Sequence, residues 1–191
     1  MIFGRSHIIA CILTLLLAPG ALLADQQPDP ELREILREAA GSATSFDDRF
    51  DAVVWLTDMS ARLARQVRDD DERMKILTLV HAEAARAGLE PELVLAVIEV
   101  ESNFDRYAVS VAGALGLMQV MPFWRNEIGR PGDNLIHAET NLRYGCTILK
   151  FYLDKEKGDL RRALGRYNGS LGQRAYPNLV IDKLTKKWFQ S

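Results

Sequence analysis

The sequence predicts a mostly α-helical protein, and three features indicate this class. Apolar residues recur at helical spacing along most of the chain, and glycines and prolines separate these stretches. No alternating apolar run is long enough for a strand. The composition, with 48% hydrophobic and 26% charged residues among 191, is that of a globular protein with a sizeable core.

The first 24 residues have the order of a secretory signal. Arg5 precedes an apolar run from Ile8 to Ala18, which a Pro-Gly break and small residues follow. This run has about half of the ~20 residues that span a bilayer. We therefore expect residues 1–24 to be a signal peptide, cleaved after Ala24, and the protein to be periplasmic. An uncleaved membrane anchor is the alternative.

The next region, residues 25–69, is expected to be a helical extension. A polar linker with two prolines is followed by a short apolar-periodic stretch and then by a longer one over residues 45–67. Ser45 with Asp48 has the spacing of a capping signal at the start of the longer helix. No residue of the extension has an assignable chemistry, so it is expected to pack against residues 70–191.

The last region, residues 70–191, predicts five helices around one long loop. Acidic residues at the start and Gly88 as the stop define the first helix. Pro91 marks the first turn of the second, which runs toward Phe104. Residues 107–123 are too rich in small residues for a helix. The remaining helices are expected at residues 137–154, 159–168 and 176–189.

Charge and cysteine content exclude several functions. The chain has 24 Lys and Arg against 26 Asp and Glu, so no basic excess indicates a nucleic-acid partner. The three histidines have no metal-ligand spacing, and we expect neither a metal nor a cofactor. Cys146 lies on one helical stripe with Leu142, Leu149 and Leu153, which favours a core residue over a nucleophile.

Two glutamates lie in the apolar stretch AVIEVESNFD, residues 96–105. At roughly 100° per residue from Leu93, Glu101 falls inside the apolar arc of the helix. Glu99 falls on the polar arc, and we expect it at the surface. Glu101 is either a buried ion pair or boundary residue, or a general acid. Burial raises the pKa of a carboxyl group and keeps a proton available near neutral pH.

The residues after Glu101 favour the general acid. Gly113 and Gly116 bracket a loop that lacks the GK[ST] sequence of a phosphate site, and Gln119 follows as an amide able to bind hydroxyl or acetamido groups. Its alternative role is to satisfy the backbone of its own loop. A later segment, RYNGS, adds a tyrosine and an asparagine. This combination around one acid is typical of carbohydrate sites.

Three segments resemble, in this order, the catalytic domain of the soluble lytic transglycosylases, a lysozyme-like family. They are ESNFDRYAVSVAGALGLMQVMP, NLRYGCTILKFYL and ALGRYNGS. The resemblance implies a lysozyme-like transglycosylase domain at residues 70–191, preceded by the helical extension. It also implies a lyase that cleaves the β-1,4 bond between N-acetylmuramic acid and N-acetylglucosamine in peptidoglycan. Water is not used, and the product carries a 1,6-anhydro-muramic acid end.

The resemblance implies that Glu101 is the catalytic residue, acting first as acid and then as base. Tyr167 is expected to orient it. Ser102 is expected to bond near it or to cap the helix, and Met118 to form an apolar wall or to pack in the core. The substrate-binding residues implied are Ser102, Ser110, Gly116, Met118, Gln119, Tyr167, Asn168 and Tyr176. The family's Asn-x-x-x-Gly motif matches Asn141 and Gly145.

The partner implied is the peptidoglycan glycan strand, bound by a monomer, with proteins of an envelope or secretion machine as further partners. Two other functions remain open. One is a hydrolase (muramidase) on the same fold, similar to goose-type lysozyme. The other is a cell-wall-binding or assembly factor that docks through residues 25–66. A helical adaptor without chemistry is a third alternative, in which Glu101 has no role.

Overall fold

Helices make up most of the described chain, which confirms the predicted class. The computed structural model describes residues 49–128 and 132–189, with side chains placed for 55–125 and 132–189. Within these residues, β-structure is limited to isolated bridges in the loop after α4. The helices are α2 (Arg49–Leu63), α3 (Asp70–Ala87), α4 (Pro91–Glu101), α5 (Phe123–Ile128), α6 (Ala138–Lys155), α7 (Leu160–Tyr167), α8 (Ala175–Lys183) and the π-helical turn η1 (Leu184–Trp188).

The helix boundaries follow the expected signals. Asp69 caps α3 by accepting a hydrogen bond from the Glu72 backbone N–H, and Gly88 ends it at a φ of +66°. Pro91 occupies the first turn of α4. Asp159 caps α7 in the same way as Asp69 caps α3. The sequence analysis missed α5 and expected one continuous final helix, whereas the structure divides it into α8 and η1.

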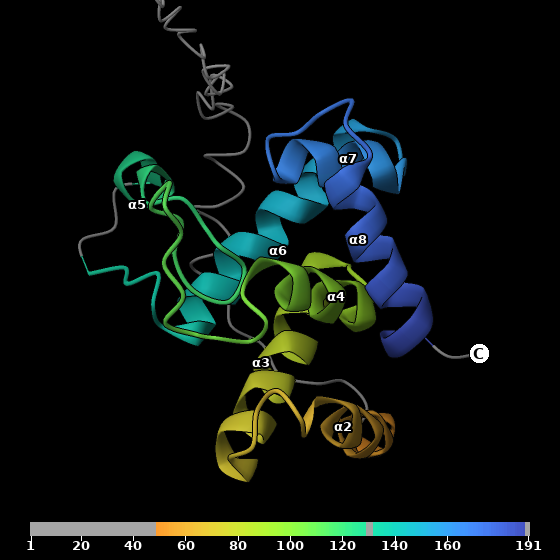
Figure 1. Ribbon diagram of the computed structural model, residues 1–191. Coiled ribbons are helices and arrows are strands. Elements are labelled where there is room, and N and C mark those ends of the chain that lie inside the picture. Colours follow the sequence, from red (N-terminus) through yellow and green to blue (C-terminus); the bar gives the residue numbers. More distant parts are fainter. Residues whose placement is uncertain (1–48, 129–131, 190–191) are drawn as a thin grey trace, which may run out of the picture.

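Helix α4 lies at the centre of the fold. It packs against α3, α8 and η1, while α6 packs against α3 and α7 (Figure 1). Seven consecutive residues of α4, from Leu93 to Glu99, are buried. A helix buried on every side presents no face to solvent, so its polar positions must find partners within the protein.

Part of the predicted N-terminal region lies outside the described residues, namely the signal peptide, the first short helix and the Ser45 cap. Helix α2 packs against α3 and η1, so its described part contacts the rest of the fold. The division at residue 69 stays a prediction. Among the helices described, none combines the length and apolarity that a bilayer crossing requires.

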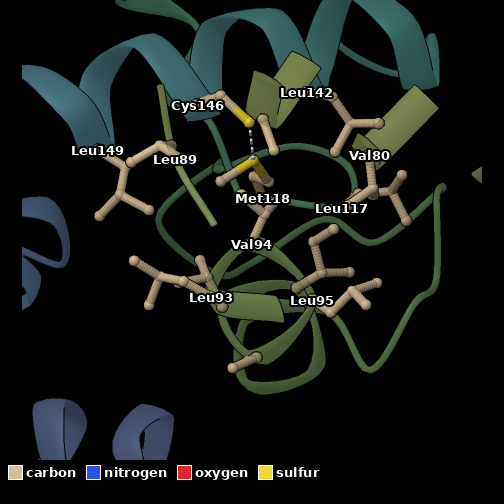
Figure 2. Packing of buried hydrophobic residues seen from close by; sticks show 14 of the residues in the cluster. Val80, Leu89, Leu93, Val94, Leu95, Leu117, Met118, Leu142, Cys146 and Leu149 are labelled. Carbon is tan, nitrogen blue, oxygen red and sulfur yellow. Dashed lines mark hydrogen bonds between the residues drawn. The ribbon is translucent and has the colours of Figure 1, made fainter. Parts of the chain in front are cut away.

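The core contains Cys146, as the sequence predicts. Cys146 is fully buried on α6, and burial raises the pKa of its thiol well above the ordinary value. Its sulfur lies 4.0 Å from that of Met118, and Val94 of α4 lies on the other side of Met118 (Figure 2). Cys146 is therefore a packed apolar residue and not a reactive thiol.

Candidate active site

Glu101 is the last residue of α4, and its side chain is half-buried. Burial raises the pKa of Glu101 from 4.5 to about 7. A hydrogen bond from Tyr176 lowers the pKa, but by less than burial raises it. The Tyr176 hydroxyl donates this bond to Glu101 Oε1 over 2.6 Å. Near neutral pH the carboxyl group therefore exists in both protonation states, which suits a group that both gives and takes a proton.

The hydroxyl that contacts Glu101 was assigned to the wrong tyrosine. The sequence analysis expected Tyr167 to orient the acid, but the Tyr167 hydroxyl donates to the Met118 carbonyl over 2.7 Å. Burial, and next the nearby charge of Glu101, raise the pKa of both tyrosines well above the ordinary value. Both hydroxyls thus remain protonated donors. Tyr176 reaches Glu101 from the first turn of α8, a contact between residues 75 positions apart.

The Asn-x-x-x-Gly motif on α6 holds the loop beside Glu101. The Asn141 side chain accepts from the Met118 backbone N–H over 2.8 Å and donates to the Leu115 and Leu135 carbonyls over 2.7 and 2.8 Å. Gly145, one turn later, leaves the space that the Met118 side chain fills. One face of α6 therefore fixes the GLMQ segment through both polar and apolar contacts.

Gly116 is required in this loop for two reasons. Its φ is +72°, a conformation that favours glycine, and a Cβ there would lie 2.7 Å from the Leu135 carbonyl oxygen. Gly116 is buried, so its part in the site is to let the loop approach α6.

Ser102 and Met118 both support the loop. The Ser102 hydroxyl donates to the Leu117 carbonyl over 2.8 Å and to Ile98 over 3.2 Å, and Ser102 is the C-cap of α4. Its capping role is thus the one observed. The Met118 side chain is fully buried, which matches core packing and contradicts the apolar wall.

Gln119 and Ser110 also bond within the loop but are only partly buried. Gln119 donates to the Gly116 and Ala108 carbonyls over 3.0 and 3.2 Å, which is the backbone-satisfying role left open by the sequence. The Ser110 hydroxyl accepts from the Ala114 backbone N–H over 2.9 Å. Asn168 is exposed at the end of α7. Contact of these three side chains with a substrate stays a prediction.

Glu99 is buried, and the expectation of a surface position is wrong. Lys183 and Lys187 donate to its two carboxylate oxygens over 2.7 and 3.1 Å, and the Trp188 indole donates over 2.8 Å. Burial alone raises the pKa of Glu99, but the bonds and charges of the two lysines outweigh it and lower the pKa. The helical wheel of α4 contained no information about α8 and η1, which cover its polar arc.

Only one of the two glutamates is therefore available for proton transfer. Glu99 is held as a carboxylate by two cations, whereas Glu101 has a neutral hydroxyl as its hydrogen-bond partner. In the described residues, no cluster of three or more His, Cys, Asp and Glu side chains has the arrangement of a metal site. The arrangement can perform general acid and base catalysis with one carboxyl group.

Comparison with known proteins identifies the family. Residues 78–187 match the transglycosylase SLT domain, which is more than half of the chain, and the chain belongs to this family. This confirms the resemblance found in the sequence. Residues 25–66 lie outside the match.

Curated relatives include the membrane-bound lytic murein transglycosylase C of Yersinia pestis (strain Pestoides F) and that of Yersinia pseudotuberculosis (serotype O:1b, strain IP 31758). Each is 34% identical over 119 residues, covering 54% of this chain and 33% of the relative. The chain thus spans about a third of the length of these relatives. Among solved structures, an inactive mutant of the lytic transglycosylase Slt from Pseudomonas aeruginosa is 26% identical, with a TM-score of 0.44, over 55% of this chain and 20% of that chain.

Proposed function

We propose that this protein is a peptidoglycan lytic transglycosylase. It cleaves the β-1,4 bond between N-acetylmuramic acid and N-acetylglucosamine and leaves a 1,6-anhydro-muramic acid end. The observation that carries the proposal is Glu101, which lies within the residues that match the SLT domain, accepts a hydrogen bond from the Tyr176 hydroxyl and has a pKa raised by burial to about 7. The names of the curated relatives agree with this activity.

In the first step, protonated Glu101 donates its proton to the glycosidic oxygen, and the bond from that oxygen to C1 of the muramic acid breaks. The acetamido oxygen of the same sugar meets the positive charge that develops at C1, as in substrate-assisted glycosidases. This replaces the second carboxylate of ordinary glycosidases. The only nearby candidate in the helix, Glu99, is bound to two lysines and faces α8 and η1.

In the second step, the C6 hydroxyl of the muramic acid attacks C1 and its proton passes to the Glu101 carboxylate. This restores the acid, and no water is consumed. Because the nucleophile belongs to the same sugar, its effective molarity is high. Tyr176 keeps the Glu101 carboxyl group in one orientation through both steps and remains a neutral donor.

The substrate contacts are proposed for the partly exposed residues around Glu101. Ser110, Gln119 and Asn168 bind sugar or peptide groups of the strand, whereas buried Gly116 acts indirectly by letting the loop approach α6. Ser102, Met118 and Tyr167 act indirectly by fixing the loop, because their side chains bond to its backbone or fill the core. The protein works as a monomer in the periplasm on glycan strands, with envelope or secretion-machine proteins as further partners.

The test is the mass of the muropeptides that the purified protein releases from sacculi. We expect products lighter by one water than those of a hydrolase, and none with Glu101→Gln. Products with a reducing end would instead identify a muramidase. Binding without release by the wild type would identify a wall-binding or assembly factor.

A further inference from the structure

The two glutamates at the end of α4 are attached to the two ends of one helical segment. Tyr176, in the first turn of α8, donates to Glu101, and Lys183, at the end of α8, donates to Glu99. Lys187 and Trp188 continue the attachment in η1. The seven residue steps from Tyr176 to Lys183 span roughly 10 Å of helix. A displacement of one end of this segment therefore moves the other.

The contacts at Glu99 are directional and buried. Its side chain is 5% exposed, and both oxygens accept bonds from charged or indole donors. The buried contacts of α8 at Pro177 and Val180 are apolar, and at the surface Asn178 accepts a hydrogen bond from Arg161 of α7. Apolar contact is non-directional and tolerates sliding, whereas charge-assisted hydrogen bonds fix one position. Glu99 thus sets where α8 lies along α4.

The π-helical turn explains how several donors reach one carboxylate. In a regular α-helix, residues five apart point to different sides. The wider π turn advances less per residue, so Trp188 comes nearer the side of Lys183 and Lys187. Trp188 is also fully buried. The departure from α-helical geometry in η1 therefore coincides with the point where three donors meet Glu99.

We propose that Glu99 is a positioning residue for the reaction: by anchoring α8 and η1, it places the Tyr176 hydroxyl on Glu101. This inference rests on the proposed function, because Glu101 is the acid whose orientation is at issue. Glu99 takes no part in proton transfer. Its effect on turnover passes through Tyr176.

The test is a variant that removes the anchor without changing the local charge. Glu99→Gln combined with Lys183→Met removes one negative and one positive charge. We expect kcat on soluble glycan strands to fall roughly tenfold, as in Tyr176→Phe, with KM within about twofold of the wild type. Adding Tyr176→Phe to the double variant should lower kcat no further, because both changes remove the same contact.

A matched control exists between α3 and α6. Glu83 is a buried carboxylate with two cationic partners, Arg86 and Arg143, and it joins α3 to α6. Glu83→Gln combined with Arg86→Met also removes one charge of each sign. We expect this variant to lose stability but to keep kcat. An equal loss of kcat in both double variants, or a full further loss on adding Tyr176→Phe, would overturn the proposal.

Two further measurements keep the test decisive. If the Glu99 double variant does not fold, Lys183→Met alone is measured, since the Lys183 side chain is 43% exposed. We expect Lys183→Met to lower kcat in the wild type but not in the Tyr176→Phe variant. An unchanged kcat in the wild-type background would contradict the positioning role.

The second measurement needs no turnover: the ¹³C titration of the Glu101 carboxyl group by NMR. Tyr167 and Tyr176 are the titratable groups that face it, and the double variant keeps the net charge around Glu99. Loss of the Tyr176 bond should raise the midpoint by roughly one pH unit. An unchanged or lower midpoint would refute the positioning role. Absence of anhydro product from the wild type would refute only the proposed function.

Discussion

Replacing Glu101 with glutamine should raise the free energy of unfolding, by an amount that depends on pH. Burial raises the pKa of Glu101 from 4.5 to about 7 in the folded protein. Between these values the folded state binds more protons than the unfolded state, so stability falls as pH rises. At about 1.4 kcal/mol per pKa unit, the wild type loses about 3 kcal/mol across this window. Glutamine stays neutral at every pH, so the variant does not lose this stability as the pH rises.

The measurement is urea unfolding of the wild type and of Glu101→Gln at several pH values from 4 to 8. The difference in the free energy of unfolding between the two proteins should be near zero below pH 4.5. It should grow as the pH rises to 7 and then stay constant, with the variant the more stable protein. A difference independent of pH, or a less stable variant at pH 8, would show that the carboxyl group is not buried as described. Stability given up for an ionisable active-site group is a common feature of enzymes.

Glu99→Gln, in the same helix, should change the free energy of unfolding in the opposite direction. The lysines lower the pKa of Glu99 in the folded protein. Its carboxylate therefore contributes stability that is present above pH 4.5 and is lost as the pH falls through the folded pKa. The variant should be less stable than the wild type at neutral pH and approach it in acid. The same sign of effect in both glutamine variants would contradict the assigned environments.

Three further results are expected. Tyr167→Phe should lower the free energy of unfolding by about 1 kcal/mol in urea, through loss of the bond to the Met118 carbonyl, and lower kcat less than Tyr176→Phe. Gly145→Ala should cost about 1–3 kcal/mol, because its Cβ would lie 2.7 Å from that of Met118; a lower Tm by circular dichroism checks this. Cys146 should react with a thiol reagent only after unfolding, because it is fully buried; reaction of the native protein would contradict the packing.

Local signals were sufficient to predict most of the helices. Gly88 is the stop that its residue type indicates, and the first-turn proline of α4 is where it was expected. These positions depend on interactions within a few residues, which a sequence shows directly. The π turn at the end of α8 was missed; its Lys187 and Trp188 bond to Glu99, a contact over more than 80 positions that no local signal shows.

In the candidate site too, the sequence predicted the features that depend on one helix and missed those that depend on tertiary contacts. Glu101 was found because a carboxyl group in an apolar arc is a local contradiction, visible on one helix. Glu99 was misplaced because the wheel treats a polar arc as solvent-facing, whereas α4 is covered on that side too. The orienting hydroxyl was assigned to Tyr167 and not to Tyr176, because tertiary packing alone decides which hydroxyl reaches the acid.

The arrangement at the end of α4 shows how one helix supports opposite electrostatic requirements. Glu101 needs a dry environment with a neutral donor, so that its proton stays available near pH 7. Cations beside Glu101 would favour the carboxylate and remove the acid at neutral pH. Both lysines, one at the end of α8 and one in η1, instead bond to Glu99, and α8 presents the Tyr176 hydroxyl to Glu101. The position of α8 thus determines both which glutamate is neutralised and which one can donate a proton.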